Sequence, residues 1–237
     1  MKKFLFVGDT NGNTGPANVN KGIVANLSDA FCIADSVNKV KKYINAFIGV
    51  VRCKVIVVSG MSKVGVCAIK LAKLLNKKTV YIMHGCYEME CALNESAVDE
   101  NSLQMEQYIL HSVDLLLPVS ERYSQIIQEK YPFCKGKTAY LHNGVEKMNL
   151  EHGGVQREKG RIIAVGGDRK LKNNITVARA MAKLGTDRVL TVYGHLYNPK
   201  NLPQGKNIEF KGLVPQTQLY EEMRKSELYI LNSVYEP

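Results

Sequence analysis

Short apolar runs alternate with amphipathic helical segments along the whole chain, and this alternation constrains the fold more than any other feature. Runs typical of buried strands occupy 3–7, 54–58, 79–83, 115–118, 138–141, 161–165, 188–193, 207–210 and 228–231. Most are separated by segments whose apolar residues recur at helical spacing. Strands that alternate with helices form parallel sheets covered by helices, so the sequence predicts an α/β fold.

One polar stretch divides this pattern. Residues 146–160 are polar, contain glycines and are typical of a linker. We therefore expect an N-terminal domain over 1–145 and a C-terminal domain over 161–237. Ligands of such folds bind at the carboxyl ends of the strands and between domains, so the loops that follow strands are the first places to search.

The charge of the chain favours an anionic partner. It has 32 Lys and Arg against 22 Asp and Glu, a formal charge of +10. Nucleotides, phosphosugars and anionic membranes all fit. Nucleic acid is disfavoured, because the basic residues are scattered rather than interleaved with aromatic residues.

The remaining composition points to a cytoplasmic protein. Six cysteines form no CxxC pair, and several lie in apolar runs, as expected of reduced thiols. No apolar stretch is long enough for a transmembrane helix, and the N-terminal run is too short for a secretory signal. His84, Cys86 and Cys91 match no standard zinc spacing, so we expect no metal.

A glycine-rich loop follows the first strand. Gly12, Asn13, Thr14 and Gly15 precede a helix that opens at Pro16. Glycines let backbone amides approach an anion at a helix N-terminus. The spacing is neither GxGxxG nor a P-loop, so a tight turn explains it equally well.

A second loop carries three cations. Gly166 and Gly167 follow a strand, Arg169, Lys170 and Lys172 come next, and a helix starts near residue 173. Cations are unfavourable at a helix N-terminus unless an anion binds there. Arg and Lys are the usual partners of a diphosphate, which makes this loop a candidate anion site. A solvated basic loop is the alternative.

His84 is the third candidate. It ends a buried strand and precedes a glycine, at the edge where functional groups collect in such folds. A structural histidine is equally compatible with this position. No Ser-His-Asp order, HExxH or Walker motif is present, and a hydrolase with paired carboxylates stays open.

Residues 36–51 form a basic amphipathic segment. Its apolar residues fall at helical spacing, and Lys39, Lys41 and Lys42 lie off that stripe. The simplest interpretation is a core helix with a solvated lysine face. Docking on anionic lipid is the functional alternative.

Taken in order, several segments resemble the GT-B nucleotide-sugar glycosyltransferases, specifically the retaining glycosyltransferase family four. The matching segments are Val80–Gly85, Ser112–Glu121, Tyr140–Val145, Val165–Asn173, Val192–Gly194, Phe210–Val214 and Leu228–Pro237. The resemblance implies two Rossmann-like domains, the second incomplete. It also implies transfer of a sugar from a nucleoside diphosphate to a hydroxyl acceptor, with retention. A bacterial surface polysaccharide or a lipid-linked acceptor fits the family and the basic charge.

The resemblance implies a role for each candidate residue. Arg169 or Lys170, with Lys172, would hold the donor diphosphate, and Leu213 and Val214 would lie beside the nucleobase. Glu236 would contact the donor sugar as the first carboxylate of an E-x7-E pair. His84 would lie beside the transferred sugar, and the loop at Gly12–Gly15 would face acceptor or phosphate. Such enzymes need no metal or cofactor, because protein cations neutralise the departing diphosphate.

Two departures from the family pattern leave alternatives open. Gly167 stands where the family has Arg, so Arg169 would supply that charge. The second carboxylate of the pair would fall beyond Pro237, so we expect a truncated second domain. A sugar-nucleotide epimerase, which turns over without acceptor, and a catalytically silent nucleotide-sugar-binding module are the alternative functions.

Overall fold

The computed structural model describes residues 3–144, 155–235 and 237 and divides into two compact units. The described part of the first unit comprises residues 3–91, 97–144 and 237, and that of the second comprises 92–96 and 155–235. Each unit is built on a parallel sheet, which confirms the predicted α/β class. Among the described residues, no helix has the length and apolar character needed to cross a membrane.

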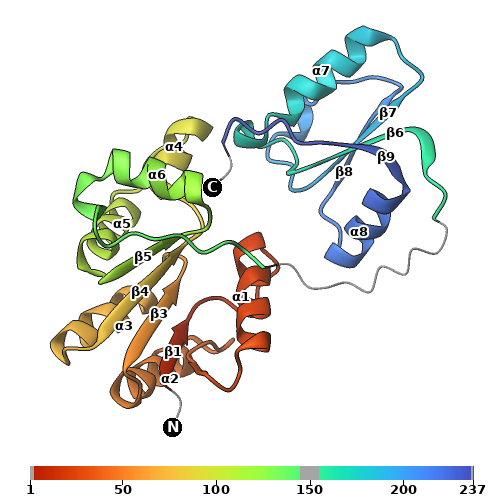
Figure 1. Cartoon of the computed structure of the whole chain (residues 1–237). Helices are drawn as coiled ribbons and strands as arrows, with labels where there is room; N and C mark the ends of the chain where they lie inside the picture. The colour runs from red at the N-terminus through yellow and green to blue at the C-terminus, as the bar shows by residue number, and fades with distance from the viewer. Residues whose placement is uncertain (1–2, 145–154, 236) are drawn as a thin grey trace. The chain divides into compact units, whose positions relative to one another are not determined.

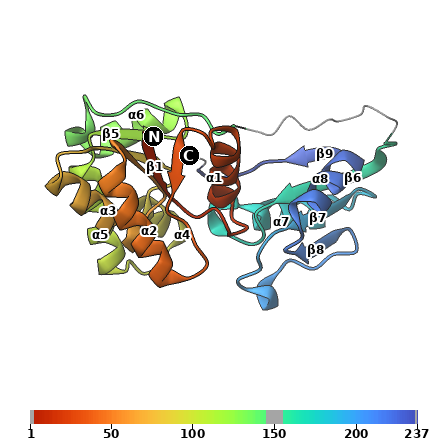
Figure 2. The ribbon, with the colours of Figure 1, turned by 90° about the horizontal axis from the view of Figure 1, so that it is seen from below.

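The first unit contains a five-stranded sheet in the order β2-β1-β3-β4-β5 (Figure 1). Its strands are β1 (Phe4–Val7), β2 (Phe31–Ile33), β3 (Val55–Ser59), β4 (Lys78–Met83) and β5 (Leu115–Pro118). Its helices are α1 (Gly15–Asn26), α2 (Lys39–Arg52), α3 (Lys63–Leu74), α5 (Glu100–Ser112), α6 (Glu121–Lys130) and the 3-10 turn η1 (Pro132–Cys134). Helix α4 (Tyr87–Asn94) begins in this unit, and its residues 92–94 are assigned to the second. Helices α2, α3 and α5 lie along one face of the sheet and α1 and α6 along the other (Figure 2).

Local sequence explains most of these elements. The central strands are apolar on both faces because helices cover both, and Leu5, Phe6, Ile56 and Val58 are fully buried. Several helices begin after a residue whose side-chain oxygen accepts a hydrogen bond from the first turn, as Ser120 does from the amide of Tyr123. Such caps satisfy amides that have no partner within the helix.

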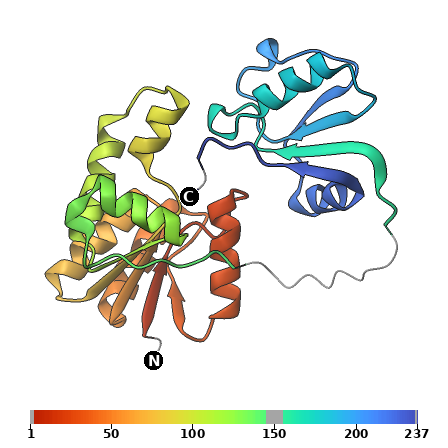
Figure 3. The ribbon, with the colours of Figure 1, turned by 45° about the horizontal axis from the view of Figure 1, so that its top comes forward.

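The second unit contains a four-stranded sheet in the order β8-β7-β6-β9. Its elements are β6 (Glu158–Val165), η2 (Lys170–Lys172), α7 (Asn174–Leu184), β7 (Val189–Tyr193), η3 (Pro199–Asn201), β8 (Ile208–Gly212), α8 (Gln216–Lys225) and β9 (Ser226–Ile230). Helices α7 and α8 lie on opposite faces of this sheet (Figures 1 and 3). The core between α7 and the strands is formed by Ile162, Ala164, Ala178, Met181, Leu190 and Val192.

Several predicted boundaries differ from the structure. β6 begins at Glu158, so the last three residues of the predicted linker are strand, while residues 146–154 lie outside the described part. The predicted strand at 138–141 does not form a regular strand, but it pairs in parallel with β5. The amides of Ala139 and Leu141 donate to the carbonyls of Leu116 and Pro118, at 3.0 and 2.9 Å. β2 was not predicted, because three residues show no periodicity. Its Phe31 is buried against Phe4 and Phe6.

The acidic stretch at 86–100 has no clear apolar periodicity, but it contains α4. The reason is a distant side chain. Glu106 of α5 is buried and accepts hydrogen bonds from the amides of Tyr87 and Glu88, at 2.6 and 3.1 Å. A carboxylate at a helix N-terminus satisfies its first amides and complements its dipole.

Most of residues 36–51 form a helix as predicted, but the interpretation that their apolar stripe packs into the core is wrong. α2 does form there, but Ile44, Phe47 and Val51 of that stripe are more than half exposed. The buried face of α2 consists of Ala46, Gly49 and Val50. A side chain at Gly49 would collide with Leu5 of β1, so small residues allow α2 to pack closely on the sheet.

Candidate functional site

The first candidate site lies at the point in the first sheet where the order of the strands reverses. In the order β2-β1-β3-β4-β5, the connections leave β1 toward one edge and β3 toward the other. Ligands of open parallel sheets bind at the carboxyl ends of strands beside such a switch point. Ser59 ends β3 there, and His84 follows β4 directly.

A chain of hydrogen bonds connects these residues. The Asn20 Nδ2 amide of α1 donates to the backbone carbonyl of Asp9 at 2.9 Å. The Ser59 hydroxyl donates to Asn20 Oδ1 at 2.6 Å and lies 2.8 Å from His84 Nε2. A hydroxyl has a single proton, so Nε2 must donate to Ser59. His84 therefore carries its proton on Nε2, and Nδ1 is left with a lone pair.

The charge of His84 follows from its burial. Desolvation lowers its pKa from 6.5 to about 4, so the ring is neutral near pH 7. A neutral ring with an Nδ1 lone pair can accept a hydrogen bond from a hydroxyl, but it cannot supply a proton at that pH. The site is therefore suited to orienting a hydroxylated ligand.

Sequence reasoning identified His84 but missed its two partners. Ser59 follows the apolar strand residues 55–58, and the same strand-end argument that selected His84 would have found it. Asn20 lies within a helix, and no local pattern marks it. Both side chains are buried, which is why their polar atoms are paired with one another.

The glycine loop after β1 is held by its own carboxylate. Asp9 accepts hydrogen bonds from the amides of Asn11 and Gly12, at 3.0 and 2.8 Å. Lys21 donates to the Gly12 carbonyl at 2.7 Å. The Gly12 amide thus faces a carboxylate where the anion interpretation requires a phosphate. These contacts favour the tight-turn interpretation of this loop.

The rest of this loop leads into α1. Thr14 caps the helix by accepting from the Ala17 amide at 3.3 Å, and Gly15 is its first residue. Asn13 precedes this cap and is exposed. These residues follow β1 and border the switch point, and their acceptor-facing role stays a prediction.

Asp35 anchors the same loop to α2. One of its oxygens accepts from the amide and hydroxyl of Thr10, at 2.6 and 2.7 Å, and from Asn11 Nδ2 at 2.7 Å. Its other oxygen pairs with Lys42 at 2.7 Å, and the carboxylate is 3% exposed. Burial alone would raise the pKa of Asp35, but hydrogen bonds from Lys42 and Thr10 outweigh it and lower the pKa to about 2.

The second candidate site lies at the carboxyl ends of β6 and β7. The amides of Gly166 and Gly167 both donate to the Tyr193 carbonyl, at 2.7 and 2.9 Å. A side chain at Gly167 would collide with the His195 carbonyl, and its φ of +62° is left-handed. The two glycines therefore let the loop after β6 touch the loop after β7. With these amides engaged, an anion here would depend on other groups.

Cations supply those groups. Arg169 precedes η2, which contains Lys170 and Lys172, and α7 begins directly afterwards. Asn173 stands at the N-cap with a φ of +54°, and its side chain does not cap α7. The first turn of α7, which the structure describes in full, contains no acidic residue. This helix end therefore carries positive potential.

A pocket of about 330 Å³ lies beside this helix end. It is lined by Asp168, Arg169, Lys170, Asn173, Ile175, Thr176, Arg179, Asn198, Asn201 and Leu202. The volume is that of a small-ligand site. Asp168 also accepts from the amides of Tyr197 and Asn198, both at 2.7 Å, and so connects the two loops.

Only some of the predicted diphosphate-binding residues line this pocket. It contains Arg169 and Lys170 and adds Arg179, which sequence reasoning missed because a lone arginine within a helix has no distinctive spacing. Lys172 does not line it, and the aliphatic part of that side chain lies over Gly166.

Three further predicted site residues lie elsewhere. Leu213 and Val214 directly follow β8, and Leu213 is 73% exposed. Glu236 lies outside the described residues. In the part of the chain that is described, no group of three or more His, Cys, Asp or Glu side chains is placed to hold a metal ion.

Comparison with known proteins identifies the fold. No protein-family model and no curated protein matches the sequence. Among solved structures, Anabaena HepE in complex with UDP matches with a TM-score of 0.68 and 14% identity, over 99% of this chain and 75% of that one. The lipopolysaccharide outer core galactosyltransferase WaaB matches with a TM-score of 0.61 and 11% identity, over 99% and 75%.

A third match is an epimerase. The UDP-GlcNAc 2-epimerase from Methanocaldococcus jannaschii aligns with a TM-score of 0.51 and 12% identity, over 97% of this chain and 78% of that one. The chain has the GT-B fold. This confirms the predicted pair of Rossmann-like domains. Identities this low show the fold alone, so membership of family four stays a prediction.

Proposed function

We propose that this GT-B chain is a glycosyltransferase that moves a sugar from a nucleoside diphosphate to a hydroxyl acceptor. The observation that carries the proposal is the basic pocket formed by Arg169, Lys170 and Arg179 at the carboxyl ends of the second sheet. Structures of similar fold hold UDP or UDP-glucose. A diphosphate is the part of such a donor that Arg169 and Arg179 would recognise, while Lys170, whose ammonium pairs with Glu95, would add to the positive field.

In this proposal the pocket cations bind the diphosphate and stabilise its charge as it departs. Preorganised cations do this without reorganisation during the reaction, so no metal is needed. Lys172 would extend the same positive field, and Leu213 and Val214 would flank the nucleobase. Glu236 would contact the donor sugar.

His84 would orient a sugar hydroxyl through its Nδ1 lone pair. Ser59 and Asn20 hold the ring in the required tautomer. The acceptor would be a saccharide or a lipid-linked saccharide on the cytoplasmic side of a membrane, and the sugar would be transferred with retention of configuration.

An epimerase is the second candidate, favoured by the match to UDP-GlcNAc 2-epimerase. It would change the configuration of the bound sugar without any acceptor. Incubating the chain with the nucleotide sugar alone distinguishes the two enzymes, because only an epimerase then yields a new sugar. A silent binding module would bind the nucleotide and turn over nothing.

Calorimetric titration with UDP, GDP, ADP and dTDP in EDTA tests the site itself. We expect one nucleotide to bind, and Arg169→Ala or Arg179→Ala to weaken it roughly 10- to 100-fold, the range for charge-assisted hydrogen bonds. Arg188→Ala is the control, because Arg188 precedes β7 at the opposite end of the sheet. If the three variants bind equally well, or if EDTA abolishes binding, the proposed diphosphate site is wrong.

A further inference from the structure

The whole net charge of the chain arises from one segment. Residues 36–87 contain ten Lys and Arg residues and no Asp or Glu. The other 22 Lys and Arg residues of the chain equal its 22 Asp and Glu residues in number, so the formal charge of +10 belongs to this segment. The segment includes α2 and α3, which pack side by side (Figures 1 and 2).

The same segment exposes large apolar side chains. On α2, Val40, Tyr43, Ile44, Phe47, Ile48 and Val51 are each 41–68% exposed. Their spacing of three and four residues places them in one stripe along the helix. Scattered exposed apolar residues are common, but a continuous stripe of this size is typical of an interaction surface.

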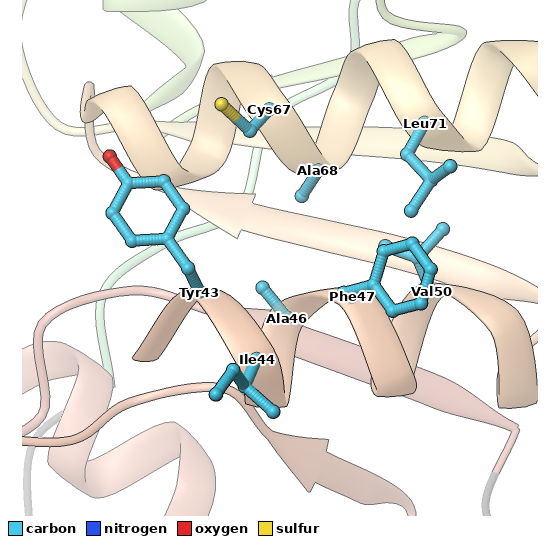
Figure 4. Close-up of a pocket in the computed structure, with 8 residues that line it drawn as sticks. All are labelled: Tyr43, Ile44, Ala46, Phe47, Val50, Cys67, Ala68 and Leu71. Carbon is cyan, nitrogen blue, oxygen red and sulfur yellow. The ribbon is translucent and has the colours of Figure 1, made fainter. Parts of the chain in front are cut away.

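A groove between α2 and α3 extends this stripe. Its volume is about 440 Å³, and Figure 4 shows Tyr43, Phe47 and Val50 on α2 facing Cys67, Ala68 and Leu71 on α3. The lining is apolar except for the Tyr43 hydroxyl and the Cys67 thiol. We call the stripe and groove together the α2–α3 surface.

Cations border the α2–α3 surface on both sides. Lys41 and Arg52 are exposed and lie eleven residues apart on α2, which places them on the same side of the helix beside the stripe. On α3, Lys63 and Lys70 are exposed and flank Cys67 at helical spacing. None of the four forms an ion pair with an acidic side chain within the described residues.

We propose that the α2–α3 surface docks on an anionic lipid bilayer. Apolar side chains at the middle of a surface and cations at its border match the acyl layer and the phosphate headgroups of such a membrane. A soluble phosphate would gain nothing from the apolar stripe, and a neutral protein partner would gain nothing from the four bordering cations. The proposal does not depend on the proposed glycosyltransferase activity.

The absence of tryptophan from the chain allows a site-specific test. Phe47→Trp places a single reporter at the middle of the stripe, and Leu184→Trp places one on α7, where Leu184 is 71% exposed. With phosphatidylcholine vesicles containing phosphatidylglycerol, we expect blue-shifted emission and quenching by brominated lipid for Phe47→Trp only. Equal responses of the two reporters, or no response at position 47, would overturn the proposal.

Co-sedimentation with the same vesicles separates charge from apolar contact. Lys41→Ala with Arg52→Ala should lower partitioning roughly 10- to 30-fold, because each cation near an anionic surface contributes about fivefold. Lys183→Ala with Lys206→Ala removes two exposed charges of the second unit and should leave partitioning within about twofold. Phe47→Ser should weaken partitioning at unchanged charge.

Varying the salt concentration and the lipid composition tests whether binding depends on charge. Binding should fall as salt rises, because screening shortens the range of the attraction, and should be weak on pure phosphatidylcholine. Equal binding to both vesicle types would overturn the electrostatic part of the proposal. A Phe47→Trp blue shift that depends on protein concentration without vesicles would assign the surface to a second copy of the chain instead. Thermal melts of each variant confirm that it is folded.

Discussion

The hydroxyl of Ser59 lies 2.8 Å from Nε2 of His84, and its only proton is donated to Asn20. These two facts determine where the imidazole proton resides. Because Nε2 is already bonded to Ser59, the unprotonated Nδ1 is the ring nitrogen that a ligand could use. A single backbone carbonyl, that of Asp9, sets the direction of the whole chain of donors through the Asn20 amide.

The tautomer of His84 is directly measurable. We expect the imidazole nitrogen shifts in NMR to report protonated Nε2 and unprotonated Nδ1 in the neutral ring. Ser59→Ala removes the acceptor of the Nε2 proton and should yield a mixture of tautomers. An Nδ1-protonated ring in the unaltered protein would contradict the assigned hydrogen-bond direction.

His84 should make stability depend on pH. Its pKa is about 4 in the folded chain against 6.5 when unfolded, so the unfolded chain binds more protons between these values. Stability should therefore fall as pH drops from 6.5 toward 4, by roughly 2–3 kcal/mol in total. Urea unfolding of His84→Gln should lack this contribution. His142→Gln, at an exposed position, is the control and should follow the unaltered protein.

Asp35 should make stability depend on pH in a lower range than His84, and it does so as an acidic group that is charged when folded. Its folded pKa is about 2 against 3.8 for an ordinary aspartate, so its contribution is complete above 3.8 and is lost as pH falls through 2. Asp35→Asn should destabilise the first unit by roughly 1–3 kcal/mol near neutral pH, because Lys42 and Thr10 lose a charged partner. The exposed Asp29→Asn should change unfolding little. Equal unfolding curves for the two variants would contradict the anchoring role.

Two glycines of the second unit test the contact between its loops. Gly167 and Gly185 have similar left-handed φ values of +62° and +55°, but only a side chain at Gly167 would meet other atoms. Gly185→Ala should cost about 1–2 kcal/mol for the backbone alone. Gly167→Ala should cost clearly more, because the methyl group collides with the His195 carbonyl. Chemical denaturation measures the difference, and equal losses would exclude the close contact.

Local patterns in the sequence determined the elements and their order. Strands buried on both faces are continuous apolar runs, and a serine such as Ser120 marks a helix start through a bond to the next turn. Both signals involve residues close in sequence, so they can be recognised without the fold. His84 was found for the same reason, since a strand end is visible in the sequence.

The environment of each candidate residue required the tertiary structure. Ser59 is 39 residues from Asn20 and 25 from His84, and Glu106 caps α4 from another helix. The amides of Gly166 and Gly167 looked available for an anion, but Tyr193 accepts them both. Bonds between distant segments leave no periodic trace in the sequence.

Helix α2 shows most clearly what a local sequence pattern leaves undecided. Its period of three and four residues determined that Ile44, Phe47 and Val51 share one side of the helix, but a period says nothing about which side meets the sheet. Packing decided that. Gly49 allows the helix to approach Leu5 closely, and Ala46 on the same buried face is also small, whereas the large side chains would hold the helix away. Helical spacing alone therefore predicts the apolar stripe, whereas its outward orientation depends on contacts with the sheet, because close packing favours the small face.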